Sequence, residues 1–141
     1  MALEPPKPGQ VIRYSYLWWN EQRQGHVEGL KDRPCGVVLS RTVEDNNTVV
    51  YVLPITHTPP MNAEHGIAIP LAVKKRLGLD AEPSWLITTE LNKFVWPGPD
   101  IRSADGKLTY GYLPEKLTRQ AQADVLKQAR NSQLKTVERD E

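Results

Sequence analysis

The sequence contains a single cysteine, Cys35, so no disulfide bond can form within one chain of 141 residues. Such scarcity of cysteine is typical of proteins from a reducing compartment. Apolar runs are also short, and none approaches the roughly 18 residues that a membrane-spanning helix needs. Residues 1–6 lack the charged and then apolar pattern of a secretion signal. We therefore expect a cytoplasmic protein that does not attach to a membrane.

The sequence also has no large excess of positive or negative charge. The 18 Lys and Arg residues nearly balance the 17 Asp and Glu residues, so the bulk composition does not indicate a nucleic-acid-binding protein. The apolar share of 39% and the charged share of 25% are those of an ordinary globular domain. We predict one domain over residues 1–141, with a core at about 8–130 and flexible ends at 1–7 and 131–141.

Alternating and β-branched runs predict several short strands. In residues 11–17 the aromatic and Ile side chains alternate with polar ones, which is the pattern of a half-buried strand. Residues 34–43 and 48–55 are both β-rich, and the Glu, Asp and Asn residues between them favour a turn, so these runs predict a hairpin. Further short strands are expected at 67–69, 84–89 and 93–96.

Two helices are predicted in the second half of the chain. Residues 70–77 begin with Pro70 and are followed by Gly78, which suits the end of a short helix. Residues 114–130 carry Leu117, Ala121, Val125 and Ala129 at steps of four, which predicts a longer helix with a narrow apolar stripe. The fold class expected from these elements is mainly β with α (α+β). We predict a small barrel of five to seven short strands with one short helix and a C-terminal capping helix.

Two chemically active side chains stand at predicted strand ends, each next to a long polar loop. Arg33 and Pro34 follow the loop 18–32 and open one strand of the hairpin. The sequence Pro54, Ile55, Thr56 closes the other strand and leads into the loop 56–66. Long loops in small domains often carry the function. An arginine and a threonine brought together there would be able to act on phosphate esters.

The order of these features resembles the MazF/PemK family of toxin endoribonucleases. The resemblance spans about residues 8–130 and depends mainly on Glu28 in the first loop, on Arg33 with Pro34, and on the step 54–56. It implies an SH3-like barrel that forms a homodimer and cleaves single-stranded RNA without a metal or cofactor. It also implies growth inhibition as the toxin of a toxin-antitoxin pair. The partner would be an antitoxin protein whose tail lies in the RNA groove.

Carried over by position, the resemblance places the catalytic arginine at Arg33, the catalytic threonine at Thr56 and an upstream acidic residue at Glu28. Arginine suits the stabilisation of a crowded phosphate because its planar, permanently charged fork holds two oxygens. It is a poor proton donor, since its pKa lies above about 12. Thr56 would donate a hydrogen bond or position the 2′-hydroxyl, and Glu28 would orient Arg33 or accept a proton.

The chain departs from the family pattern at two positions near this site. Lys31 stands where the family usually has glycine, and His57 stands where it has Ser or Thr. A histidine near its ordinary pKa of about 6.5 can supply the proton transfer that arginine cannot, so His57 joins the candidate catalytic residues. The candidate RNA-binding residues are Lys31, Trp18, Trp19, His26 and Thr58.

Simpler roles remain open for most of these residues. Arg33 can be a solvated residue at a strand entry and Thr56 a turn-forming hydroxyl. Tryptophan is more often a core or interface residue than a base-stacking platform. Lys74, Lys75 and Arg76 could track a phosphate backbone, but a run of charges at a helix end is usually a solvated cap. The three histidines show no known metal-site spacing, so no metal is expected, and Cys35 is expected to be a buried apolar residue.

Three functions follow in order of preference. The first is a sequence-selective endoribonuclease that leaves a 2′,3′-cyclic phosphate and a 5′-hydroxyl. The second is a catalytically inert barrel that binds RNA, DNA or a partner peptide in the same groove. The third is a protein-binding adaptor whose contact surface is formed by Trp18, Trp19 and Trp96.

Overall fold

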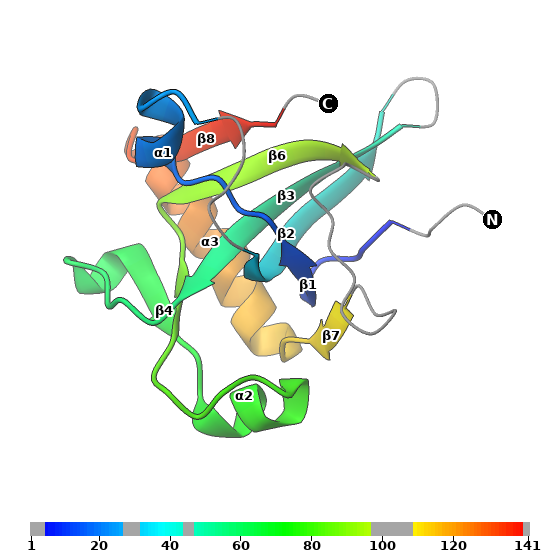
Figure 1. Cartoon of the computed structure of the whole chain (residues 1–141), viewed down its shortest axis with the longest axis vertical. Coiled ribbons are helices and arrows are strands. Elements are labelled where there is room, and N and C mark those ends of the chain that lie inside the picture. Colours follow the sequence, from blue (N-terminus) through cyan, green and yellow to red (C-terminus); the bar gives the residue numbers. More distant parts are fainter. Residues whose placement is uncertain (1–4, 27–31, 44–46, 97–108, 140–141) are drawn as a thin grey trace.

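The computed structural model describes residues 5–26, 32–43, 47–96 and 109–139, and Figure 1 shows the arrangement of their elements. Eight strands of these residues form one sheet, accompanied by three α-helices, so the predicted mainly β fold with helices is confirmed. No helix in the described ranges has the length and apolarity that crossing a membrane requires. The elements in chain order are β1 (Gln10–Tyr14), α1 (Trp19–Arg23), β2 (Arg33–Thr42), β3 (Thr48–Thr56), the 3-10 turn η2 (Ala63–His65), β4 (Gly66–Ala68), α2 (Leu71–Leu77), β5 (Trp85–Ile87), β6 (Glu90–Trp96), β7 (Thr109–Tyr112), α3 (Glu115–Arg130) and β8 (Lys135–Glu138).

The sheet is built around β3, which pairs on both sides. Along one edge it forms the predicted hairpin with β2. On its other edge the first half of β3 pairs with β6, and its last two residues, Ile55 and Thr56, pair with β5. The sheet therefore divides near Pro54, which has no N–H to give to a ladder. One branch continues through β6 to β8 and the other through β5 to β4.

The sheet does not close into the predicted barrel. On the side of β2 it runs through β1 to β7, and none of the described strands pairs β7 with β4 or with β8. Helix α3 covers one face of this open sheet, and Figure 1 shows it crossing behind β2 and β3. Its residues Leu117 and Ala121 are buried against this face. The predicted apolar stripe of α3 is confirmed at these two positions, but Ala129 is exposed and Gln128 is buried in its place.

Two apolar clusters hold the layers together. One lies between the sheet and the helices α2 and α3, and includes the fully buried Leu53 and Leu86. The other is aromatic and lies under β1, β2, β3 and β6, where the rings of Tyr14 and Phe94 stack 4.7 Å apart. Cys35 is fully buried in this second cluster, and burial raises the pKa of its thiol. The prediction that Cys35 is an inert apolar residue is therefore confirmed.

The prediction of a flexible C-terminal segment is wrong for residues 135–139. Residues Lys135–Glu138 form β8, which pairs in parallel with β6. Val137 is completely buried and Arg139 is 6% exposed. A short, mostly polar segment does not show in its sequence that a distant strand will supply its hydrogen bonds, and this explains the error. At the extreme ends, residues 1–4 and 140–141 lie outside the described residues.

The side chain of Asn92 in β6 makes the hydrogen bonds to the segment after β1 that a neighbouring strand would otherwise make. Its side chain accepts a hydrogen bond from the Leu17 N–H at 2.9 Å and donates one to the Leu17 carbonyl at 2.7 Å. The Arg139 guanidinium also donates to Asn92 Oδ1 at 3.1 Å and to the Ser15 carbonyl at 2.7 Å. This polar cluster inside the core fixes where the chain enters α1.

Substituting Asn92→Leu should destabilise the protein by about 2–4 kcal/mol, because it leaves the buried Leu17 N–H and carbonyl without partners. The free energy of unfolding from urea titration measures the effect. Lys93→Ala is a matched control on the same strand, since the Lys93 side chain makes an exposed ion pair with Glu138 and a cation–π contact with Tyr51, and it should cost no more than about 1.5 kcal/mol. Equal stability of wild type and Asn92→Leu would contradict this account.

Candidate functional site

A cleft of about 1270 Å³ opens where β2 begins and β3 ends. Its walls come from α1, from the turn after β3, from the loop between α2 and β5, and from the beginnings of β6 and β8. Both polar and aromatic side chains line it. Those used below are Trp18, Trp19, Arg23, Arg33, Thr56, His57, Thr58, Lys74, Asp80, Ser84, Glu90, Tyr110 and Lys135.

The structure brings Arg33 and Thr56 to this one cleft. They lie on neighbouring strands, because β2 and β3 are antiparallel and Cys35 pairs with Pro54. Arg33 and Thr56 each lie two residues beyond this pair, at the same end of the two strands. The expected convergence of these two side chains is therefore confirmed, while their catalytic role stays a prediction.

The guanidinium of Arg33 contacts an aromatic ring. Its guanidinium lies 5.0 Å from the ring centroid of Trp18, within the range of a cation–π contact. Its Nε is buried and makes no hydrogen bond within the described part of the chain. Buried donors normally have a partner, so this Nε is an exception, while the positive charge of the guanidinium beside the cleft suits an anionic ligand. Glu28, the predicted partner of Arg33, lies outside the described residues.

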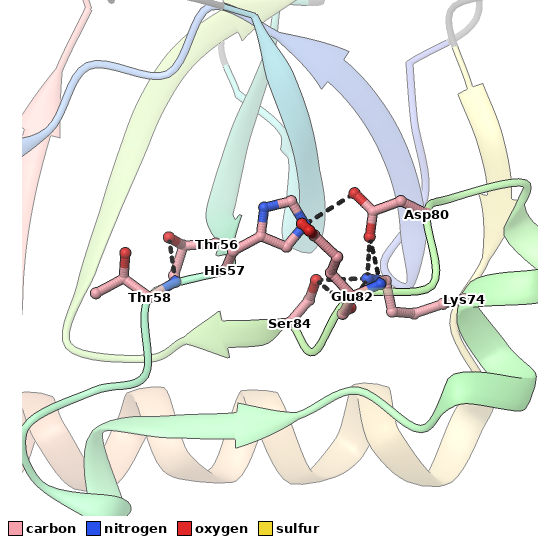
Figure 2. Close-up of polar contacts among 7 residues, drawn as sticks. All are labelled: Thr56, His57, Thr58, Lys74, Asp80, Glu82 and Ser84. Atoms are coloured by element: carbon pink, nitrogen blue, oxygen red, sulfur yellow. Dashed lines mark hydrogen bonds and ion pairs between the residues drawn. The ribbon is translucent and has the colours of Figure 1, made fainter.

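Thr56 ends β3 in a local turn. Its Oγ1 accepts a hydrogen bond from the Thr58 N–H at 3.1 Å, as Figure 2 shows. This is the turn-forming role that the sequence left open. It does not exclude the other role, since a hydroxyl that accepts one hydrogen bond still has its proton to donate.

His57 extends from the same turn toward the loop after α2. Its Nε2 lies 2.8 Å from Asp80 Oδ2 and 3.7 Å from Glu82 Oε2 (Figure 2). The side chains of His57 and Asp80 are 53% and 51% exposed. The imidazole is therefore oriented by carboxylates yet open to a ligand in the cleft.

The side chain of Lys74 holds Asp80 and the loop after α2 in this arrangement. Only 2% of it is exposed, and its Nζ donates to Asp80 Oδ1 and to Ser84 Oγ, both at 2.6 Å, and to the Glu82 carbonyl. The hydrogen bond from Lys74 lowers the pKa of Asp80. The prediction of a solvated cap is thus wrong for Lys74, although its neighbours Lys75 and Arg76 are exposed. One indication was present in the sequence, since Lys74 lies three residues before the buried Leu77 and so shares its face of α2.

Trp18 and Trp19 both line the cleft, and Trp18 also packs against the aromatic cluster. Trp18 packs edge to face on Tyr16 at 5.2 Å, beside the aromatic cluster, while it also lines the cleft. Trp19 lines the cleft with the ammonium of Lys135 5.9 Å from its ring centroid. Trp18 therefore belongs to the core as well as to the cleft wall, while the base-stacking role of both residues stays a prediction. Trp96 is buried, so it cannot form an exposed contact surface with them as the adaptor hypothesis requires.

The remaining predicted RNA-binding residues do not all reach the cleft. Thr58 lines it, whereas the exposed His26 does not. Lys31 lies outside the described residues. No sequence pattern indicated Glu90, which lines the cleft and also contacts the core. Glu90 Oε1 accepts hydrogen bonds from the Tyr16 hydroxyl at 3.1 Å and from the Trp19 N–H at 3.0 Å, and burial raises its pKa.

No protein-family model, no curated protein and no solved structure matches the chain. The resemblance to the MazF/PemK family therefore depends on the residues of this sequence alone. Among the described residues, the set suited to hold a metal ion is His57, Asp80 and Glu82.

Glu90→Gln should gain stability relative to wild type as the pH rises. A raised pKa in the folded state means that folding binds a proton, so the contribution of Glu90 falls when the pH rises above the ordinary value of 4.5. Glutamine keeps the acceptor oxygen without titrating. Urea unfolding of both proteins between about pH 4 and about pH 8 measures the difference. A relative gain of the variant toward low pH would contradict the assignment.

Proposed function

We propose that this protein is a sequence-selective endoribonuclease that cleaves single-stranded RNA without a metal ion. One observation carries the proposal: Arg33 and Thr56, which come from neighbouring strands, line one open cleft. The permanent positive charge of Arg33 at this cleft adds support for an anionic substrate.

The residues divide the chemistry of transesterification among them. The 2′-oxygen loses its proton and bonds to phosphorus, and the bond from phosphorus to the 5′-oxygen breaks as that oxygen gains a proton. Arg33 holds the nonbridging oxygens while charge builds on them. Thr56 donates to a nonbridging oxygen or positions the 2′-hydroxyl. His57 moves the protons, with Asp80 orienting its ring. The products are a 2′,3′-cyclic phosphate and a 5′-hydroxyl.

The composition of the cleft favours a single-stranded nucleic acid over a small molecule. Its volume of about 1270 Å³ exceeds the upper end of ordinary small-ligand pockets, about 1000 Å³. Trp18, Trp19 and Tyr110 offer ring faces, and Arg23 and Lys135 add positive charge beside them. Aromatic platforms and cations together are the usual means of binding unpaired bases and their backbone.

The wider biological role is inferred from the resemblance to the MazF/PemK family. The protein would act in the cytoplasm as the growth-inhibiting toxin of a toxin-antitoxin pair and would form a homodimer. An antitoxin protein would then inhibit it by laying a segment across the same cleft, where it would compete with RNA.

Arg33→Ala and Thr56→Val should each slow cleavage by about 10²–10³-fold, the usual loss when one donor to a developing oxyanion is removed. The assay incubates the purified chain with mixed-sequence single-stranded RNA and EDTA, and maps the cuts and their end groups. Arg119→Ala is the control, because Arg119 is an exposed residue of α3 that pairs with Glu115 outside the cleft. Undiminished cutting by Arg33→Ala would exclude the assigned role.

An inert RNA-binding domain is the second candidate, since the aromatic and cationic wall suits binding whether or not cleavage follows. The same samples distinguish the two. Saturable binding of RNA by wild type, with every RNA left intact and with weaker binding by Arg33→Ala, would replace the nuclease by the binding domain.

A further inference from the structure

Three potential metal ligands meet at the edge of the cleft, and the proposed cleavage does not need all of them. His57 comes from the turn after β3, whereas Asp80 and Glu82 come from the loop between α2 and β5. One ligand atom of each lies within 4.8 Å of the other two. All three residues are exposed, so an ion has access to them from solvent.

We propose that His57, Asp80 and Glu82 form a binding site for a single Zn²⁺ ion. One imidazole nitrogen and two carboxylate oxygens match the ligand types that zinc accepts. Three protein ligands leave a fourth position for water or for an oxygen of a bound molecule, as in open zinc sites.

The present distances are close to those that zinc requires. Bonds of about 2.0–2.2 Å in a tetrahedron separate neighbouring ligand atoms by about 3.4 Å. His57 Nε2 lies 2.8 Å from Asp80 Oδ2 and 3.7 Å from Glu82 Oε2, on either side of that value. The carboxylate oxygens of Asp80 and Glu82 lie within 4.8 Å of each other, so the exposed Glu82 side chain has to turn toward His57 and Asp80 to complete the geometry.

Zinc fits this set better than the hard cations do. Mg²⁺ and Ca²⁺ prefer a shell made entirely of oxygen, whereas one of the three ligand atoms of this cluster is nitrogen. Cu²⁺ would bind the same imidazole, as the general order of metal affinity predicts. Zinc is nevertheless the probe of choice because it brings no redox chemistry.

Lys74 both prepares the site and limits its affinity. Its ammonium holds Asp80 Oδ1, which leaves Oδ2 directed at His57 and reduces the freedom of the carboxylate. Such outer contacts orient metal ligands in proteins. The same positive charge lies close to the proposed cation and repels it. The site is therefore suited to reversible occupancy rather than to permanent structural zinc.

Zinc at this position would also regulate the nuclease, a consequence that depends on the proposed function. With Nε2–H donating to Asp80, the lone pair that accepts a proton in cleavage is on Nδ1. An ion bound at Nε2 leaves the ring proton on Nδ1 and so removes that lone pair. Bound zinc would thus stop cleavage while Arg33 and Thr56 remain in place.

Equilibrium dialysis of the EDTA-treated and desalted chain against ZnCl₂ tests the site directly. We expect saturation at a single zinc per chain and no retention of Mg²⁺. His57→Ala and Glu82→Gln should lose this bound zinc. Glu115→Gln, a change of an exposed carboxylate on α3, should keep it. Circular dichroism of each variant checks that it is folded. Absence of zinc from wild type, or full retention by both cluster variants, would overturn the site.

A cleavage assay at increasing ZnCl₂ tests the regulation separately. Zinc should inhibit wild type and Glu115→Gln, and the ratio of rates with and without zinc should approach one in Glu82→Gln. Full cleavage by zinc-saturated wild type would overturn the regulation. If no RNA is cut even without zinc, the proposed function fails, whereas the dialysis result still decides the site.

Discussion

The antiparallel register between β2 and β3 is the constraint on which the candidate site depends. Pairing of Cys35 with Pro54 places Arg33 and Thr56 at the same end of the hairpin. Because side chains alternate between the two faces of a sheet, a slip of one residue would turn one of them away from the cleft. The register is also the one that buries Cys35 in the aromatic cluster, so packing and site geometry require the same alignment.

Strand β2 of the same hairpin contains a bulge, and at this point it contacts α3. The pairing with β3 shifts between Val37 and Leu39, and the Val38 carbonyl there accepts a hydrogen bond from Gln122 of α3 at 3.0 Å. Bulges bend a strand and increase its twist. The helix and the hairpin are thereby joined through a backbone group that the ladder leaves free.

The elements that depend on a short stretch of sequence could be predicted from local patterns. The hairpin, the short helix that ends at Gly78, and most of the stripe of α3 follow from turn chemistry and periodicity. Two local elements were missed, since α1 lies inside the segment 18–32 that was predicted as a loop and β7 was not predicted. The other errors concern distant partners. Neither the pairing of β8 with β6 nor the open edges at β7 and β4 can be deduced from the segments involved.

The site divides in the same way. Arg33 and Thr56 stand at strand ends beside long loops, and that position singled them out in the sequence. The buried Lys74 and its partners Asp80 and Ser84 belong to a helix face and a short loop whose apposition exists only in the folded chain. Glu90 likewise gains its role from contacts with residues more than 70 positions away.

The forked sheet has a consequence for how the molecule meets its own copies. Among the described strands, the ones at the ends of the sheet are β4, β7 and β8, with 3, 4 and 4 residues. The hairpin strands β2 and β3, which are far longer, lie in the interior of the sheet. Brief edges give a strand from another molecule few backbone groups to pair with, which protects a β-rich protein against uncontrolled assembly in a crowded cell.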